Sequence, residues 1–186
     1  MAIDPILTEA GQKMGKSVDA LQRELTSIRT GRANPSLIDR VAVSYYGNPT
    51  PLNQLAQIST PEPRLLLVNV YDRNAVAAVE KALRAPEVGL NPSSDGNVVR
   101  VPIPPLTEER RKEYVRLVRQ KAEEARVAIR NVRRDELHRI DRLAKEGEVA
   151  GDEAHRAHER LQKITDEHVE TVDQLAARKE SEVMEV

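Results

Sequence analysis

The stretch VRLVRQKAEEARVAIRNVRRDELHRI, residues 115–140, decides the architecture. Its apolar residues alternate at spacings of three and four, as on one face of an amphipathic helix; they are Val115, Val118, Ala122, Ala125, Ile129 and Val132. The pattern runs from Thr107, a plausible cap after Pro104-Pro105, to the glycines of KEGEVAGD. A helix of about 39 residues would span roughly 58 Å. Such a length exceeds a compact globule, so the helix needs long partner helices.

Two further segments supply those partners. Ten of the eleven prolines lie between Pro35 and Pro105, which leaves the two ends of the chain open to long helices. The first helix is expected to begin at Asp4 as N-cap and to stop near Thr30-Gly31. A third is expected from Asp152, with an apolar stripe at Ala154, Ala157, Leu161, Ile164, Val172, Leu175 and Val183. Three amphipathic helices can bury their stripes only against each other, which predicts a three-helix bundle.

The proline-rich middle block has a different pattern. Strands are expected over 41–45, 65–71 and 98–103, with a short helix in AVAAVEKAL, a turn at YGNPTP and a loop at GLNPSSDGN. The predicted fold class is therefore α+β with two domains. Residues 1–30 and 105–186 form the bundle, and residues 31–104 form a small inserted α/β domain.

Two crossings join the predicted domains, at residues 30–32 and 103–106. Thr30 and Gly31 lie in the first, and Pro104 and Pro105 lie in the second. Two short connections limit separation while permitting rotation, and glycine supplies backbone freedom. These four residues are therefore predicted to form a hinge.

The composition narrows the class of protein. The chain of 186 residues is 32% charged and has no Trp, Phe or Cys, so its core must be aliphatic and it has no disulfide or thiolate chemistry. No apolar run is long enough to cross a bilayer, and the N-terminal residues lack an apolar signal core. We therefore expect a soluble cytoplasmic protein without a membrane association.

Basic residues are concentrated on the second helix. Residues 111–134 hold nine basic and three acidic residues, whereas residues 147–186 hold five basic and eleven acidic ones. Lys112, Arg119, Arg126 and Arg133 lie seven apart beside the apolar seam, with Arg116 and Arg130 on the next line outward. Two interpretations remain open. The arginines pair with acidic residues of the third helix, or together they form a site for a polyanion such as folded RNA.

Signatures of catalysis and of nucleotide binding are missing from the sequence. It contains no Walker loop, no GxGxxG and no nucleophile elbow. His155, His158 and Glu159 could share a metal, but the spacing matches no zinc signature, and a polar helix surface is the better interpretation. We expect neither enzyme activity nor a metal or cofactor.

Several motifs resemble those of one family. IRTGRANPSL (28–37), VPIPPLTEERRKEYV (101–115) and EARVAIRNVRRD (124–135), with YYGNPTPLNQLA (45–56) and GLNP (89–92), resemble the bacterial ribosome recycling factors over essentially the whole chain. The resemblance implies an L-shaped, tRNA-like molecule made of a three-helix rod and an α/β domain. It also implies a monomer that binds the post-termination ribosome and, with elongation factor G and GTP hydrolysis, splits it into subunits.

The resemblance also assigns site residues. The family's rod contacts large-subunit ribosomal RNA near the peptidyl-transferase centre through arginines that correspond here to Arg111, Arg130, Arg133 and Arg134. Arg29 and Arg32, at the first crossing, are expected as secondary contacts. The α/β domain is expected to face elongation factor G. The alternatives are a general RNA-binding protein and a helical adaptor, which would bind unrelated duplex RNA or a non-ribosomal protein instead.

Overall fold

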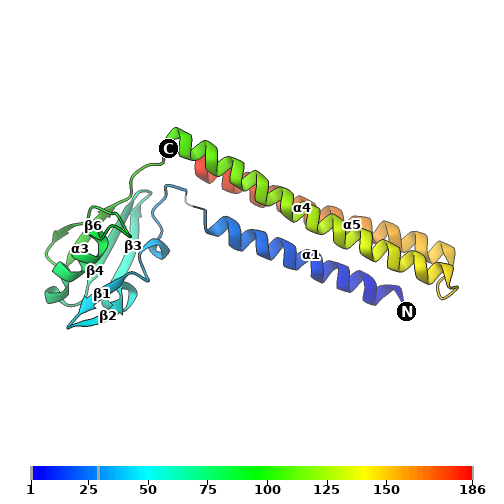
Figure 1. The fold of residues 1–186 in the computed structure, drawn as a ribbon, viewed down its shortest axis with the longest axis horizontal. Coiled ribbons are helices and arrows are strands. Elements are labelled where there is room, and N and C mark those ends of the chain that lie inside the picture. Colours follow the sequence, from blue (N-terminus) through cyan, green and yellow to red (C-terminus); the bar gives the residue numbers. More distant parts are fainter. Residues whose placement is uncertain (1, 29, 186) are drawn as a thin grey trace. The chain divides into compact units, whose positions relative to one another are not determined.

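A computed structural model describes residues 2–28 and 30–185 of the chain. It divides into two compact units, Met1–Thr30 with Glu108–Glu185 and Gly31–Thr107 (Figure 1). The first unit contains only helices, and the second contains all the strands. This combination of long helices and a small antiparallel sheet confirms the predicted α+β fold class.

The helical unit consists of α1 (Ile3–Thr26), α4 (Glu108–Lys145) and α5 (Gly151–Met184). A short loop connects α4 to α5, and the helices lie side by side (Figure 1). Most residues that face inward are aliphatic, and Glu136 and Thr165 are the buried polar residues among those described. The largest fully buried side chains are Met14, Ile129, Ile140 and Leu161. Each helix thus buries one apolar stripe against the other two.

Two predicted helix caps are wrong. The first helix begins at Ile3, before Asp4, because Ile3 is itself a buried member of the apolar stripe. The Asp4 carboxylate instead accepts a hydrogen bond of 3.1 Å from Arg160 of α5. The third helix begins at Gly151. The Asp152 carboxylate accepts a hydrogen bond from Arg156, one turn later in the same helix. In both cases the carboxylate still lies in the first turn, where it complements the helix dipole.

A cluster of four charges lies between α1 and α4. Glu136 of α4 is only 2% exposed, and its carboxylate accepts a hydrogen bond of 2.8 Å from Lys13 of α1. Arg139 lies 3.3 Å from Glu136 and 2.6 Å from Glu9, which also pairs with Lys13 at 2.8 Å. Hydrogen bonds from Lys13 and then Arg139 lower the pKa of Glu9 to about 2. The cluster therefore supplies cationic partners to a buried carboxylate within a largely aliphatic core.

The second unit contains a hairpin and a four-stranded antiparallel sheet. Strands β1 (Ala42–Tyr45) and β2 (Asn48–Pro51) form the hairpin. The sheet has the order β3-β4-β6-β5 and consists of β3 (Ala56–Glu62), β4 (Leu65–Val70), β5 (Ser93–Asp95) and β6 (Val98–Pro102). Short helical segments complete the unit, namely η1 (Pro35–Leu37), α2 (Leu52–Leu55), η2 (Arg73–Ala75) and α3 (Val76–Arg84).

One face of the sheet forms the second core. Alternate residues of β4 and β6, Leu66, Val68, Val99 and Val101, are completely buried. They belong to the same core cluster as Val79 and Leu83 of α3 and as Val43 of the hairpin. Burial alternates along both strands, and their short runs of Leu and Val are typical of buried strands, which is why they were predictable from the sequence.

Two segments expected as irregular are strands. YGNPTP supplies the turn Tyr46-Gly47 and also all of β2, which tolerates two prolines because it pairs only with β1. GLNPSSDGN contains β5, a three-residue edge strand beside β6. No periodic pattern indicated β3, whose residues beyond Ile58 are mostly exposed. These strands form because a regular neighbour offers them hydrogen bonds, not because of their own propensity.

Candidate functional site

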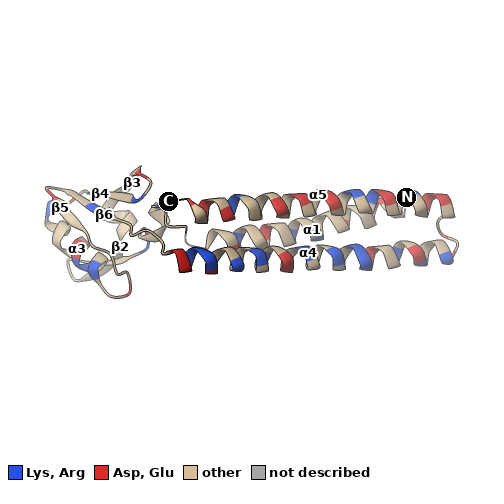
Figure 2. Cartoon of the chain, turned by 90° about the horizontal axis from the view of Figure 1, so that it is seen from above, with Lys and Arg blue, Asp and Glu red and all other residues tan. Residues whose placement is uncertain are grey.

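Three arginines of α4 line the edge that faces α5. Arg119, Arg126 and Arg133 recur every seven residues, and basic residues recur along α4 in Figure 2. Arg119 donates to Glu180 of α5 through two nitrogens, at 2.9 and 3.3 Å. Arg126 donates to Asp173 of α5 at 2.8 Å. For these two arginines, the interpretation as interhelical ion pairs is correct.

Arg133 breaks this series. A partner seven residues along the acidic line, after Glu180 and Asp173, would be Asp166. Arg133 Nη1 instead donates to the amide oxygen of Gln162 at 3.1 Å, and the Gln162 amide nitrogen donates to Asp166 at 2.8 Å. The Arg133 Nε atom is buried without a hydrogen-bond partner. The guanidinium is thus held by a neutral amide, and a new anionic partner would not have to displace a carboxylate from it.

The next line outward is exposed and carries Arg116, Arg130 and Arg134. Arg130 pairs with Glu123, which also accepts from Arg126 at 3.2 Å. Hydrogen bonds from Arg126 first and then Arg130 lower the pKa of Glu123. Arg134 lies 3.6 Å from Asp135, and Arg116 has no ion pair within the described part of the chain. Among the residues described, Arg130 shares its carboxylate with Arg126, only Arg134 has another one nearby, and Arg116 has none, so this surface is basic.

The structure thus brings together three of the predicted RNA contacts, Arg130, Arg133 and Arg134, within two turns of α4. Arg111 does not join them. It lies in the first turn, 19 residues before Arg130 and so about 28 Å away along the helix. Arg111 is half-buried and lies seven residues before the buried Val118. Its Nε atom has no hydrogen-bond partner.

Two further predicted contacts lie elsewhere. Arg32 is exposed and belongs to the sheet-containing unit, while Arg29 lies outside the described residues. Sequence reasoning placed Arg116 on the outward line but did not include it as a contact. Sequence reasoning also missed Gln162. The sequence does show a neutral residue at this position within the acidic stretch of α5, and that residue could have indicated an arginine without an acidic partner.

The residues predicted to form a hinge lie between two anchored stretches. On the sheet side, Ala33 N donates to Pro63 O at 2.7 Å and Ile103 N donates to Arg64 O at 2.8 Å. Both connecting segments are therefore tied to the same turn between β3 and β4. On the helical side, Ile28 N still bonds to Leu25 O, and α4 begins at Glu108.

Thr30, Gly31, Pro104 and Pro105 occupy the interval between these anchors. Gly31 has φ +74°, a left-handed conformation that favours glycine. A Cβ atom there would lie 3.4 Å from Leu106 Cγ and 3.6 Å from Leu106 N. The two connecting segments therefore lie side by side at this glycine.

Two of the four histidines, His155 and His158, lie near carboxylates. When protonated, His155 can pair with Glu159 at 3.6 Å. His158 Nε2 lies 2.8 Å from Asp141 Oδ1, at an angle outside hydrogen-bonding geometry. Residues 2–28 and 30–185 contain no group of three or more metal-ligating side chains. Within the same residues, every helix is too short or too polar to cross a membrane.

Comparison with known proteins identifies the family. The family model described as ribosome recycling factor matches residues 21–184. The chain belongs to the ribosome recycling factor family. It is 54% identical over 184 residues to the ribosome-recycling factor of Thermomicrobium roseum, covering 99% of this chain and all of that protein. It is 51% identical over 181 residues to that of Bacillus subtilis, covering 97% and 98%.

Solved structures agree with this assignment. A solution structure of the ribosome recycling factor matches with a TM-score of 0.72 and 44% identity, covering 100% of this chain and 99% of that one. A second match is the ribosome recycling factor of T. thermophilus, in a structure that includes E. coli elongation factor G bound to the E. coli post-termination complex. Its TM-score is 0.63 with 49% identity, and both chains are fully covered. The predicted family is confirmed, while the individual contact residues remain predictions.

Proposed function

We propose that this protein binds the post-termination ribosome and, with elongation factor G and GTP hydrolysis, separates it into subunits for a new round of translation. The observation that carries the proposal is the identity of about half the residues over nearly the full length of factors of that name. The test is a light-scattering assay of subunit splitting on post-termination ribosomes. Splitting should require this protein, elongation factor G and GTP together, and splitting that is unaffected by its omission would refute the proposal.

The arginine edge of α4 is the proposed binding surface for large-subunit ribosomal RNA near the peptidyl-transferase centre. Arg130, Arg133 and Arg134 are its centre, with Arg116 on the same face. Arg111, Arg29 and Arg32 are proposed as separate contacts nearer the junction. The donors of a guanidinium group match the oxygens of a phosphate. Arg133 is bonded to an amide, so it can bind a phosphate without losing an ion pair.

The energy for splitting must come from the GTPase partner, since the sequence carries no nucleotide-binding motif. The proposed role is that of a monomeric, non-enzymatic lever acting in the cytoplasm, where its ribosomal substrate is. Elongation factor G would move the sheet-containing unit about the segments 30–32 and 103–106. The anchors at Ala33 and Ile103 support this assignment, because they confine any rotation to the few residues before α4 and after α1.

Ribosome affinity is expected to fall with added salt. If a few phosphates are neutralised by the arginine edge, a plot of log affinity against log salt concentration should have a slope of about −2 to −4, by analogy with simpler nucleic acids. Filtration binding to vacant ribosomes over a range of potassium concentrations would measure it. A slope near zero would mean that protein contacts, and not phosphates, hold the factor.

Replacing Gly31 is expected to slow splitting more than it weakens binding. Alanine at φ +74° costs about 1 kcal/mol, so the Gly31→Ala connection should lose mobility and splitting should slow about fivefold. Gly147→Ala is the matched control, because Gly147 has φ +76° but lies in the loop between α4 and α5 with open space around it. An equal loss of binding and splitting in Gly31→Ala would assign the glycine to docking.

The alternatives make different predictions. A general RNA-binding protein would bind unrelated duplex RNA as tightly as ribosomes, and a helical adaptor would bind a non-ribosomal protein. Competition of ribosome binding by duplex RNA of matched length separates the first alternative from the proposed function.

A further inference from the structure

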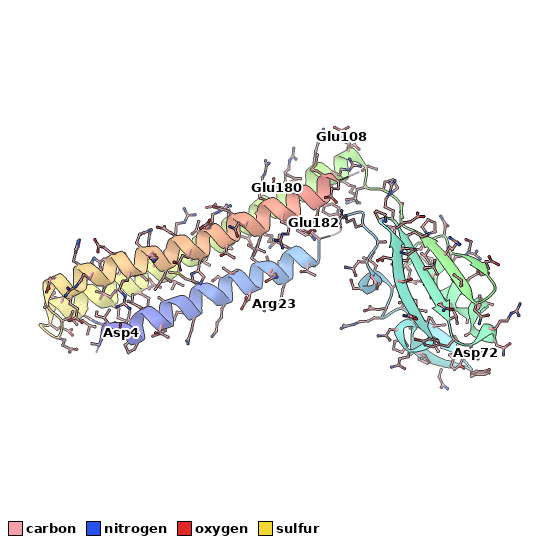
Figure 3. The ribbon with its side chains drawn as sticks, turned by 180° about the vertical axis from the view of Figure 1, so that it is seen from behind. Asp4, Arg23, Asp72, Glu108, Glu180 and Glu182 are labelled. Carbon is pink, nitrogen blue, oxygen red and sulfur yellow. The ribbon has the colours of Figure 1, made fainter. Side chains whose placement is uncertain are left out.

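Two tyrosines of the sheet-containing unit contact the same acidic residue. Asp72, labelled in Figure 3, follows β4 and accepts hydrogen bonds from the Tyr45 hydroxyl at 2.9 Å and the Tyr46 hydroxyl at 3.4 Å. The rings of Tyr45 and Tyr46 meet edge to face, with centroids 4.6 Å apart. Tyr46 and Tyr71 are the two most exposed large apolar side chains described, at 74% and 68%.

Tyr46 occupies an unfavourable backbone position. It has φ +47°, and among the described residues it is the only one other than glycine with a positive φ. Together with Gly47, at φ +81°, it forms the two-residue loop between β1 and β2. Such loops favour Asn-Gly, because asparagine tolerates the left-handed conformation, which costs tyrosine about 1 kcal/mol. An exposed aromatic ring is thus present where folding alone would favour asparagine.

We propose that Tyr46 and Asp72 form a docking site for a protein partner that inserts an arginine or lysine side chain. The exposed Tyr46 ring can attract a cation. The Asp72 carboxylate can complete an ion pair with it, and the long Tyr46 hydrogen bond, at 3.4 Å, is the one that the cation would replace most easily. Exposed tyrosines are also frequent at the energetic centres of protein interfaces.

Charge argues for a protein partner here and against RNA. The carboxylate repels phosphate, and Arg73, the next residue, leaves the local charge balanced and not basic. Three arginines within five residues distinguish the RNA surface proposed on α4. This site rests on the proposed function, because its partner is sought among the proteins of the ribosome and elongation factor G.

A purely structural role for Tyr46 predicts a different mutant behaviour. If the ring serves the fold, through Tyr45 and Asp72, then Tyr46→Asn should lower the melting temperature of the full chain. If it serves docking, Tyr46→Asn should leave the melting temperature equal or raise it, because Asn-Gly suits the turn. The same variant should then reduce splitting activity with elongation factor G about 3- to 30-fold, the range expected for loss of a desolvated cation–aromatic contact. A lower melting temperature, or unchanged splitting, would overturn the proposal.

A cross-linking experiment identifies the partner class. The full-length variant Tyr46→p-benzoylphenylalanine keeps an aromatic ring at the site and is irradiated on post-termination ribosomes with elongation factor G. We expect a protein adduct at a peptide that contains arginine or lysine. An adduct to ribosomal RNA, or none above the level of the same substitution at Gln57, an exposed residue of β3, would contradict the proposal.

The wild-type chain and Arg133→Ala in the same splitting assay separate the two levels of inference. Wild-type protein without activity would refute the proposed function itself. Active wild-type protein, impaired Arg133→Ala and fully active Tyr46→Asn would refute the docking site alone.

Discussion

Arg133→Ala is expected to weaken ribosome binding by about 5- to 150-fold, which corresponds to ~1–3 kcal/mol for a lost charge-assisted contact. The reason is local to α4. Arg133 is held by the Gln162 amide and not by a carboxylate, so its charge is available for phosphate. Its removal leaves Gln162 bonded to Asp166, so the bundle should lose about 1 kcal/mol or less. Equilibrium binding to vacant ribosomes and thermal unfolding measure the two effects.

Arg119→Ala is the matched control. Arg119 lies two heptads earlier on the same line, but its guanidinium is engaged by Glu180. Because this pair is exposed, its loss should change stability little, and it should change ribosome binding much less than the loss of Arg133. Equal weakening of binding by both variants would show that total charge, and not the amide-held guanidinium, determines affinity. If neither variant weakened ribosome binding, the arginine edge would be a solvated surface without a role in binding.

Replacing both basic partners of Glu136 should destabilise the helical unit strongly. In the double variant Lys13→Met, Arg139→Met the carboxylate, 2% exposed, loses its cationic partners. An orphaned buried charge costs about 3–5 kcal/mol. Denaturant unfolding at neutral pH followed by helical circular dichroism measures this loss. Adding Glu136→Met should restore most of the stability, because the charge itself is then removed, and a failure to restore it would assign the loss to packing.

The stability of the double variant Lys13→Met, Arg139→Met should depend on pH differently from that of wild type. The pKa of Glu9 is about 2, below its ordinary value of 4.5, because of Lys13 and then Arg139. A depressed carboxyl pKa stabilises the fold above pH 4.5, and the contribution disappears as the pH falls from 4.5 towards 2. The double variant has already lost it, so the stability difference between the two proteins should narrow over that range. A constant difference would mean that Glu9 contributes nothing.

The helices and the regular strands were predictable because their burial is periodic in the sequence. The stripe through Ala122 and Ile129 identified α4, and the alternation of Val99 and Val101 identified β6. The short strands β2 and β5 were not predictable from the sequence, because each is stabilised by hydrogen bonds to a neighbouring strand and not by its own residues.

The candidate site was predictable only in part, for a similar reason. A helical wheel shows that Arg119, Arg126 and Arg133 share a line. It does not show which residue of α5 stands opposite each one, because that depends on how the two helices are aligned in space. The alignment places carboxylates against the first two and Gln162 against the third. The distinction between paired and available arginines therefore required the structure.

The uneven distribution of chromophores makes the two units optically separable. Three tyrosines belong to the sheet-containing unit, Tyr114 alone belongs to the bundle, and tryptophan is absent. Far-ultraviolet dichroism is dominated by the long helices, whereas tyrosine emission comes mainly from the other unit. Unfolding curves recorded with both signals would coincide only if the units melt as one. The natural sequence thus allows their thermodynamic coupling to be measured without a label.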